Sequence, residues 1–321
     1  MRSFWKDLLT AIFMGMILPG LLLNTIVKLN PPEPEQTGGN PETSQPTIAR
    51  ETGLSVSLLR KDGSVCRLEM EEYLTGVVLA EMPASFESEA LKAQAVVART
   101  YTLKVSQAGY KHENADVCTD YACCQAYTEP ESYTGGQDNL EKVRSAVIAT
   151  GDLVLTYEGN LIEATYFSCS GGSTEDAVAV WGTDYPYLRA TESPGEENAA
   201  YFTDTVSFAS SDFADTLGVS GTGSPDTWFG FTTYTAGGGV NTMRICGKDF
   251  SGTELRMRLG LRSTNFTVDV VGDMITITTK GFGHRVGMSQ YGADAMALNG
   301  STYDQILAHY YQGTKLVSFG D

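Results

Sequence analysis

Residues 112–127, HENADVCTDYACCQAY, contain three of the chain's six cysteines and one of its three histidines. One imidazole and two or three thiolates favour zinc, although the H-x5-C-x5-C spacing differs from the common paired-knuckle pattern. The candidate zinc ligands are His112, Cys118 and Cys124, with Cys123 as a further thiol. Outside the cytoplasm the alternative is a disulfide, for which the other thiols are Cys66, Cys169 and Cys246. The spacing alone leaves both interpretations open.

Glu81 is the candidate for an acid catalyst. It stands between the apolar stretches GVVLA and MP, at the end of a predicted helix. Burial and the negative end of the helix should both raise the pKa of its carboxyl. A carboxylic acid that stays protonated near neutral pH can donate a proton to a glycosidic oxygen. The alternative, which position alone favours, is an ordinary, partly exposed glutamate at a helix end.

Other polar residues stand where a ligand could be held. Lys92 and Arg99 are seven residues apart and share one face of the second predicted helix. They could hold an anionic or polyhydroxyl substrate, or form a solvated basic face. Ser168 and Ser170, at the end of a predicted strand, suit sugar hydroxyls or a plain polar turn. No serine sits in a nucleophile elbow beside a general-base histidine, which disfavours a serine hydrolase.

The glycine-rich loop GFGHRVGMSQYGA surrounds His284. Its glycines allow the backbone to approach a ligand closely. Ser289, Gln290 and Tyr291 supply mixed hydrogen-bond donors and acceptors there. His284 could equally be a structural histidine. His309, in the last predicted helix, is expected to pack against other residues or to cap the helix. The loop is therefore a second candidate for substrate binding.

The N-terminus indicates the compartment. Residues 8–27 form an uncharged, mostly apolar run behind Arg2 and Lys6, long enough at about 1.5 Å per residue to span a bilayer. A cleaved signal peptide is the alternative, but the run is long and lacks a clear cleavage site. The charge asymmetry predicts a cytoplasmic tail at residues 1–7 and an extracytoplasmic remainder. The net charge of −17 argues against nucleic acid as a partner.

The rest of the chain predicts a flexible Pro- and Glu-rich linker at residues 28–53, followed by one α+β domain at residues 54–321. Helices are expected over residues 69–81, 87–105, 137–150, 207–218, from about 289, and 302–311. Hairpins are expected around Asp62-Gly63 and Gly159-Asn160, and strands over residues 254–258 and 265–278. A long loop over residues 106–136 carries the His/Cys segment.

Five stretches, in order, resemble the stage II sporulation protein D and amidase-enhancer family of peptidoglycan-active proteins. They read LAEMPASFESEALKAQAVVARTY, HENADVCTDYACCQAY, SGGSTEDAVAVWG, PYL and GFGHRVGMSQYGADAMALNG with ILAHYYQGT. They cover most of residues 54–317, and the single predicted anchor matches too. The His/Cys segment is similar to that of the clostridial branch, whereas other branches lack it.

The resemblance implies a membrane-anchored lytic transglycosylase, which cuts the MurNAc–GlcNAc bond of glycan strands whose peptides an amidase has removed. The family acts in forespore engulfment, between the mother-cell and forespore membranes, in complex with that amidase and a polytopic membrane protein. Glu81 falls on the family's catalytic acid, which would then accept the proton of the muramic 6-hydroxyl and leave 1,6-anhydro ends. Lys92 and Arg99 fall on positions implicated in activity or substrate binding. The zinc is expected to be structural.

Two departures from the family pattern stand out. Arg285 replaces a glycine of the glycine-rich loop, where it would disturb a positive φ or add a sugar contact. Cys123 replaces a histidine of the clostridial relatives, which makes it an additional candidate zinc ligand. Two alternative functions stay open, the first because the resembled family includes enhancers and the second because of the metal-binding residue types. One is a non-enzymatic, glycan-binding enhancer of a cell-wall amidase, and the other is a zinc hydrolase centred on the His/Cys segment.

Overall fold

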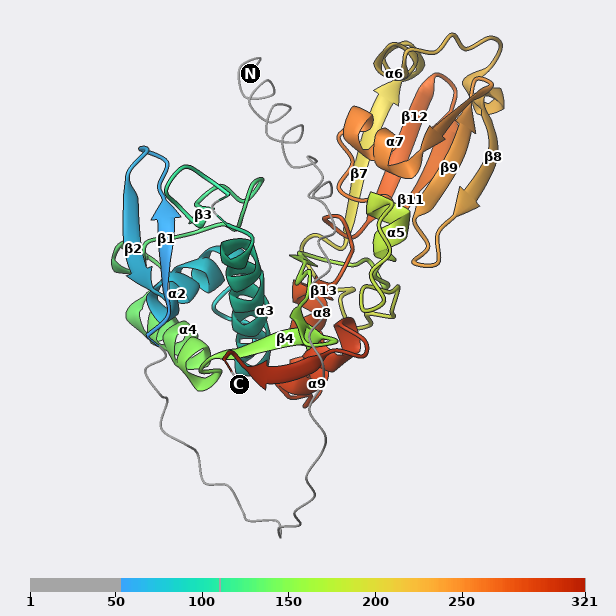
Figure 1. The fold of residues 1–321 in the computed structure, drawn as a ribbon. Coiled ribbons are helices and arrows are strands. Elements are labelled where there is room, and N and C mark those ends of the chain that lie inside the picture. Colours follow the sequence, from blue (N-terminus) through green and yellow to red (C-terminus); the bar gives the residue numbers. More distant parts are fainter. Residues whose placement is uncertain (1–52, 110, 321) are drawn as a thin grey trace, which may run out of the picture. The chain divides into compact units, whose positions relative to one another are not determined.

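Helices and short strands are interspersed along residues 53–109 and 111–320, which the computed structural model describes (Figure 1). The strands belong to five small sheets rather than to one βαβ sheet, which confirms the α+β class. No helix within these residues is long and apolar enough to cross a membrane. The predicted tail at 1–7, the anchor at 8–27 and nearly all of the linker at 28–53 lie outside the described residues, so they stay predictions.

Helix α3 (Ser88–Gln107) is the centre of the larger hydrophobic core. Four of its alanines are buried, which lets neighbouring elements approach closely. It packs against four helices and a strand. These are α2 (Met70–Glu81), α4 (Gln137–Ala149), α8 (Gln290–Leu298), α9 (Tyr303–Tyr310) and β4 (Leu153–Tyr157). The helices expected over 69–81, 87–105 and 137–150, and the two last ones, are therefore confirmed.

A three-stranded sheet anchors the first half of the long loop. β1 (Ser55–Leu59) pairs antiparallel with β2 (Val65–Glu69), which confirms the hairpin around Asp62-Gly63. β1 also pairs in parallel with β3 (Val117–Cys118). One of the candidate zinc ligands, Cys118, is thereby fixed to the edge of a sheet.

Two further small sheets bring distant segments of the larger core together. β4 pairs with β5 (Asn160–Leu161) and with the last strand, β14 (Lys315–Ser318). β6 (Tyr166–Phe167) pairs in parallel with β13 (Met288–Ser289). This second pairing places the segment that contains Ser168 and Ser170 beside the glycine-rich loop.

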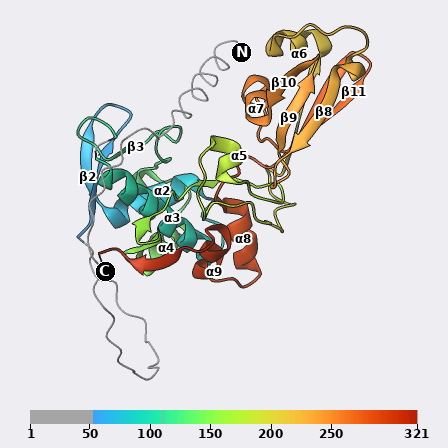
Figure 2. The same cartoon turned by 45° about the vertical axis from the view of Figure 1, so that its right-hand side comes forward.

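Residues 203–280 build a second hydrophobic core. Its two antiparallel sheets have the strand orders β11-β12-β7 and β10-β9-β8. Helices α6 and α7 lie beside these strands (Figure 2) and bury Phe213 and Leu255. The elements are β7 (Thr203–Ala209), α6 (Ser210–Leu217), β8 (Phe229–Tyr234), β9 (Val240–Ile245), β10 (Lys248–Ser251), α7 (Gly252–Leu259), β11 (Phe266–Val271) and β12 (Met274–Lys280).

Three short turns of helix complete the described elements. They are α5 (Ala177–Trp181) and the 3-10 turns Pro130–Ser132 and Pro225–Trp228.

The strand predicted over residues 254–258 is wrong, because this segment lies in α7. Alternation in ELRMR suggested a strand, yet Leu255 and Leu259 are both buried at the four-residue spacing of a helix. The hydroxyl of Ser251 begins this helix by accepting the N–H of Glu254 at 3.1 Å. A short-range polar cap therefore decided the structure of this segment.

Other elements differ from the predictions only at their ends. The helix expected over 207–218 begins at Ser210, because the preceding residues pair in β7. The strands expected over 265–278 are the hairpin of β11 and β12. The hairpin after β4 turns at Glu158 and Gly159, both at positive φ, one residue earlier than expected.

Candidate active site and metal-binding cluster

Glu81 is the last residue of α2, which ends there because Met82, the residue before a proline, adopts an extended backbone. The Oε1 atom of Glu81 accepts a 2.7 Å hydrogen bond from the backbone N–H of Ala126. Tyr166 and Gln290 lie near this carboxyl and lower its pKa, while the Nε2 atom of Gln290 donates to Gln94 Oε1 at 3.5 Å. Three segments that are distant in the sequence thus converge on one partly buried carboxyl.

Burial raises the pKa of the Glu81 carboxyl above its ordinary value. The hydrogen bond from Ala126 and the nearby Tyr166 and Gln290 lower this pKa, but only in part. The sequence predicted a pKa raised by burial and by the negative end of the helix, and burial is the cause that the structure bears out. The arrangement can hold a proton on the carboxyl, and the N–H of Ala126 can stabilise the carboxylate once the proton has left.

Tyr166 stays a hydrogen-bond donor in this site, because burial and the nearby Glu81 raise the pKa of its hydroxyl well above the ordinary value. Its single O–H donates to Oε1 of Gln125 at 3.2 Å rather than to Glu81. The Nε2 atom of Gln125 donates in turn to Tyr73 Oη at 3.1 Å and to Thr102 Oγ1 at 3.0 Å. Gln125 is buried, so it ties the end of the His/Cys segment to α2, α3 and β6.

The four predicted ligands form one cluster. One nitrogen or sulfur atom from each of His112, Cys118, Cys123 and Cys124 lies within 4.8 Å of the others. His112 Nε2 is 3.3 Å from Cys124 Sγ and 3.6 Å from Cys123 Sγ, and the two sulfurs are 3.9 Å apart. No cysteine among the described residues forms a disulfide.

These distances fit a tetrahedral zinc site. Ligands at about 2.1 Å for nitrogen and about 2.3 Å for sulfur leave neighbouring ligand atoms roughly 3.6–3.8 Å apart. The separations within the cluster span this range, and Cys123 supplies the fourth ligand that three residues alone would lack. A set of four protein ligands leaves no open position, which is typical of a structural site.

The cluster is joined directly to the candidate acid. Cys124 is two residues before Ala126, whose N–H holds Glu81, and Gln125 between them is locked by its buried hydrogen bonds. A metal ion on the thiolates would therefore hold the segment that positions the carboxyl. With a metal ion bound, the cluster would support the site rather than form a second centre of chemistry.

The pairing of β6 with β13 assembles the glycine-rich side of the site. Gln290 lies near the carboxyl of Glu81. Tyr291 is partly exposed and donates its N–H to the carbonyl of Ser168 at 3.0 Å. The buried side chain of Ser289 caps α8 by accepting the N–H of Gly292 at 3.2 Å. Gln290 and Tyr291 are thus placed to act, whereas Ser289 is used by the fold.

Direct contact with a substrate is not supported for Arg99. Its side chain is 1% exposed. The guanidinium donates to the carbonyl of Leu153 and to Thr150 Oγ1, both at 3.1 Å. Arg99 therefore joins α3 to β4. Lys92 is partly exposed, pairs with Glu89 at 2.6 Å and has no hydrogen bond or ion pair to Glu81 in the described structure.

Ser170 is also corrected to a structural residue. It is fully buried, and its Oγ and N–H donate to the carboxylate of Glu196 at 2.9 and 2.6 Å. Cys169 and Ser193 donate to the same carboxylate. Sequence reasoning missed Glu196, because the pattern ESPGEEN reads as a solvated acidic turn.

His284 cannot serve as a general acid near neutral pH. Burial and the positive charge of Arg256 lower the pKa of its imidazole to about 3. Its Nδ1 accepts the N–H of Val286 at 3.1 Å, so the neutral ring carries its proton on Nε2. The ring packs against Phe167 and Trp181. The interpretation as a structural histidine is the one that this geometry favours.

The backbone of Arg285 has a positive φ of 65°, the conformation that a glycine at this position of the family loop would allow. It is fully buried, and its guanidinium pairs with Glu175 at 2.9 Å. The same guanidinium donates to the carbonyls of Ser170, Ser173 and Gly237, each at 2.7 Å. These four contacts offset the backbone strain, and the burial of the guanidinium keeps it away from a sugar.

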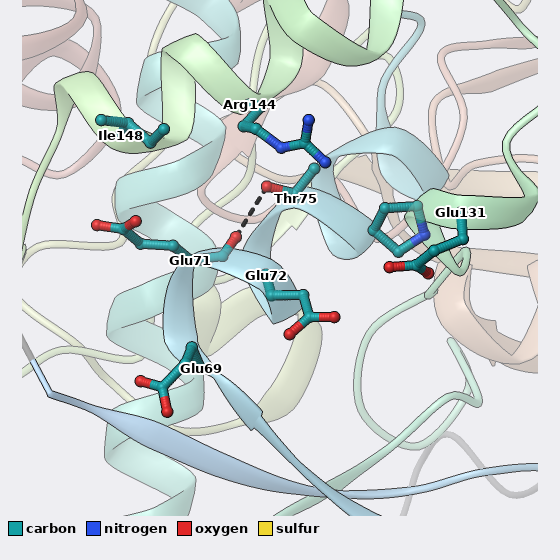
Figure 3. A pocket seen from close by; sticks show the side chains of 8 residues that line it. Glu69, Glu71, Glu72, Thr75, Glu131, Arg144 and Ile148 are labelled. Atoms are coloured by element: carbon teal, nitrogen blue, oxygen red, sulfur yellow. Dashed lines mark hydrogen bonds between the residues drawn. The ribbon is translucent and has the colours of Figure 1, made fainter. Parts of the chain in front are cut away.

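A hollow of about 280 Å³ lies at the other end of α2 (Figure 3). Half of its lining residues are acidic, and the lining comprises Glu69, Glu71, Glu72, Thr75, Pro130, Glu131, Arg144 and Ile148. Glu71 precedes Glu81 by ten helical residues, which corresponds to about 15 Å. The hollow contains none of the predicted site residues and is separate from the candidate acid.

The fold and the site define an α+β protein with one buried acid beside a His/Cys cluster. Residues 60–157, which contain both, match the SpoIID family, described as Stage II sporulation protein. The chain is 41% identical over 281 residues to Stage II sporulation protein D of Bacillus amyloliquefaciens, covering 85% of this chain and 81% of that protein. The Bacillus subtilis (strain 168) protein of that name is 41% identical over 260 residues, covering 79% and 76%.

A more distant relative is the Amidase enhancer of Bacillus subtilis (strain 168). It is 31% identical over 302 residues, which cover 77% of this chain and 40% of that protein. The chain therefore belongs to the stage II sporulation protein D family, as its motifs predicted.

Glu81→Gln is expected to stabilise the fold at neutral pH but not in acid. Because the pKa of Glu81 is raised in the folded state, the stability that its protonated form contributes is complete below the unfolded-state pKa of about 4.3. It is lost as the pH rises through the folded-state pKa. The neutral amide does not titrate. Thermal unfolding of the full chain from about pH 4 to about pH 8 measures the difference in Tm between variant and wild type.

Glu72→Gln is the matched control, since Glu72 is an exposed glutamate of the same helix. Its Tm difference from wild type should not grow with pH. A Glu81→Gln difference that is equally independent of pH would contradict the raised pKa.

Proposed function

We propose that this chain is a lytic transglycosylase that cleaves the MurNAc–GlcNAc bond of peptide-stripped glycan strands during engulfment in sporulation. The observation that carries the proposal is the partly buried carboxyl of Glu81, with its raised pKa and the backbone N–H of Ala126 that holds it. Membership of the stage II sporulation protein D family supports the process.

One carboxyl is sufficient for this reaction. Protonated Glu81 donates its proton to the glycosidic oxygen as positive charge develops at the muramic C1. The resulting carboxylate then accepts the proton of the 6-hydroxyl of the same sugar, whose oxygen bonds to C1 and closes the 1,6-anhydro ring. The internal nucleophile replaces the water that a hydrolytic pair of carboxylates would activate.

The surroundings of the carboxyl suit both states of the acid. The N–H of Ala126 donates to Oε1 of Glu81. Tyr166 in β6 and Gln290 in α8 lie near the same carboxyl. Burial favours the protonated form of Glu81 before the reaction. The hydrogen bond from Ala126 then lowers the free energy of the carboxylate that forms. The partial exposure of the side chain leaves it accessible to a glycan.

We also propose a structural zinc ion held by His112, Cys118, Cys123 and Cys124. Because four protein ligands fill a tetrahedral site, this zinc would not activate a water, which argues against the zinc-hydrolase alternative. Its contribution would be to stabilise the segment through Gln125 and Ala126 that positions Glu81.

The remaining assignments are proposals as well. The predicted single anchor at residues 8–27 would place residues 54–321 outside the cytoplasm, between the mother-cell and forespore membranes. The partners would be the sporulation amidase and a polytopic membrane protein. Similarity to a relative named Amidase enhancer supports a link to an amidase. It also keeps a non-enzymatic enhancer as the second candidate function.

Glu81→Gln is expected to reduce the rate of glycan cleavage by at least about 10²-fold, because the amide can neither donate nor accept the reacting proton. The full chain is incubated with amidase-treated glycan strands, and mass spectrometry counts the 1,6-anhydromuramic ends. Glu72→Gln, on the exposed face of α2, should keep the wild-type rate. Wild-type protein that yields no such ends, but still stimulates a cell-wall amidase, would establish the enhancer function instead.

Cys124→Ser is expected to lose the bound zinc and to slow glycan cleavage by about tenfold to a hundredfold, because the ion fixes the segment that holds Glu81. Metal content by mass spectrometry and the rate of anhydro-end formation are measured on the same preparation of full chain. Cys66→Ser is the control, since Cys66 lies outside the cluster. Zinc retained in Cys124→Ser, or full activity without zinc, would refute this role.

A further inference from the structure

A row of aromatic rings leads away from the candidate active site. Phe86 packs edge-on against Tyr291, with ring centroids 5.0 Å apart. Tyr291 lies 6.4 Å from Tyr201, which lies 5.5 Å from Phe282. Because Tyr291 follows Gln290, which lies near the Glu81 carboxyl, the row begins beside the candidate acid.

The far end of this row is exposed but firmly placed. Tyr201 is 41% exposed and Phe282 is 39% exposed. Phe282 exchanges two backbone hydrogen bonds with Cys169, of 2.7 and 3.1 Å, and the N–H of Gly281 donates to Phe202 at 2.8 Å. Large aromatic side chains that are exposed to solvent on an ordered backbone are typical of a ligand-binding surface.

One cation completes this surface. The guanidinium carbon of Arg262 lies 5.4 Å from the ring centroid of Tyr201 and 5.7 Å from that of Phe282. Its Nε atom pairs with Asp204 at 3.1 Å, and a third of its side chain is exposed. Its two terminal nitrogens have no hydrogen-bond acceptor within the described residues. A guanidinium with unused N–H groups is suited to a planar carboxylate.

We propose that Tyr201, Phe282 and Arg262 bind an N-acetylmuramic acid unit of the glycan strand, and that Arg262 selects units whose lactyl carboxylate is free. The inference rests on the proposed function and names how its substrate would be chosen. The two rings would cover the apolar face of the sugar, and the terminal nitrogens of Arg262 would donate to the carboxylate.

The negative charge of the free lactyl carboxylate supports this choice of ligand. Removal of the peptide converts a neutral lactyl amide into an anion on every second sugar of the strand. The chain as a whole carries a net charge of −17, which repels such a strand in general. The guanidinium of Arg262 offsets that repulsion only where the lactyl carboxylate is free. The protein should therefore bind stripped strands in preference to peptide-bearing strands.

The test measures binding of the full chain carrying Glu81→Gln, which should bind glycan without cutting it. Two probes are compared: peptide-stripped strands, and the same strands with their carboxylates converted to methylamides. The free strands should bind about fivefold more tightly, as expected for a partly exposed ion pair. With Arg262→Gln added, this ratio should fall to about one. With Tyr201→Ala added, both probes should bind more weakly.

Arg244→Gln is the matched control, because Arg244 is an exposed arginine that also pairs with an aspartate, Asp249. It should keep the fivefold ratio. Equal binding of both probes by the parent protein, or an unchanged ratio with Arg262→Gln, would overturn the proposal even if anhydro ends are formed. Failure to bind either probe would contradict the proposed function itself, and the inference with it.

Discussion

The hydrogen bond between the backbone N–H of Ala126 and the carboxyl of Glu81 joins the two chemical features of this protein. A carboxyl at the end of an apolar helix gains a raised pKa from burial, but burial alone would leave it without an orientation. The segment that provides the N–H begins at Cys124, a member of the His/Cys cluster, and passes through the buried Gln125. The position of the acid thus depends on a loop that has little secondary structure of its own.

A cluster of four potential metal ligands is suited to fixing the conformation of this loop, because backbone pairing alone does not fix it. Within residues 106–136 the only described strand is the two-residue β3, which pairs with β1. The cluster gathers the two ends of the segment, His112 and Cys124, while the side chain of Gln125 bonds to Tyr73, Thr102 and Tyr166. A metal ion held by the cluster would therefore act on the same few residues as these buried hydrogen bonds.

Buried charges hold the opposite side of the site. Arg285 pairs with Glu175 and binds three carbonyls, and Glu196 accepts hydrogen bonds from the segment around Ser170. Breaking such a pair would leave one charge buried without a partner, which is strongly destabilising. These residues explain how two irregular segments, one of them rich in glycine, keep a fixed shape next to Glu81 and Gln290.

Much of the helical core could be predicted from the sequence, because α2, α3 and α4 have clear apolar periodicity and clear ends. The members of the His/Cys cluster could be found because local composition marks them, whereas Glu81 also needed the resemblance to the family, since its position alone favoured an ordinary glutamate. The roles of Gln125, Tyr166, Glu175 and Glu196 could not, because each depends on a partner far away in the chain. Arg99 and Ser170 were misassigned since polarity does not reveal burial. The strand predicted in place of α7 failed because a period of two and a period of four both fit so short a segment.

The central claim is that Glu81 acts as a protonated acid and needs no second carboxylate. The dependence on pH of the rate of 1,6-anhydro-end formation tests it most directly, with the full chain and peptide-stripped strands as the reactants. The rate should be constant in acid and fall as the pH rises through a single apparent pKa above the ordinary glutamate value, since only the protonated form can start the reaction. A rate that instead increases with pH over that range, or strand cleavage that leaves reducing ends, would contradict the account.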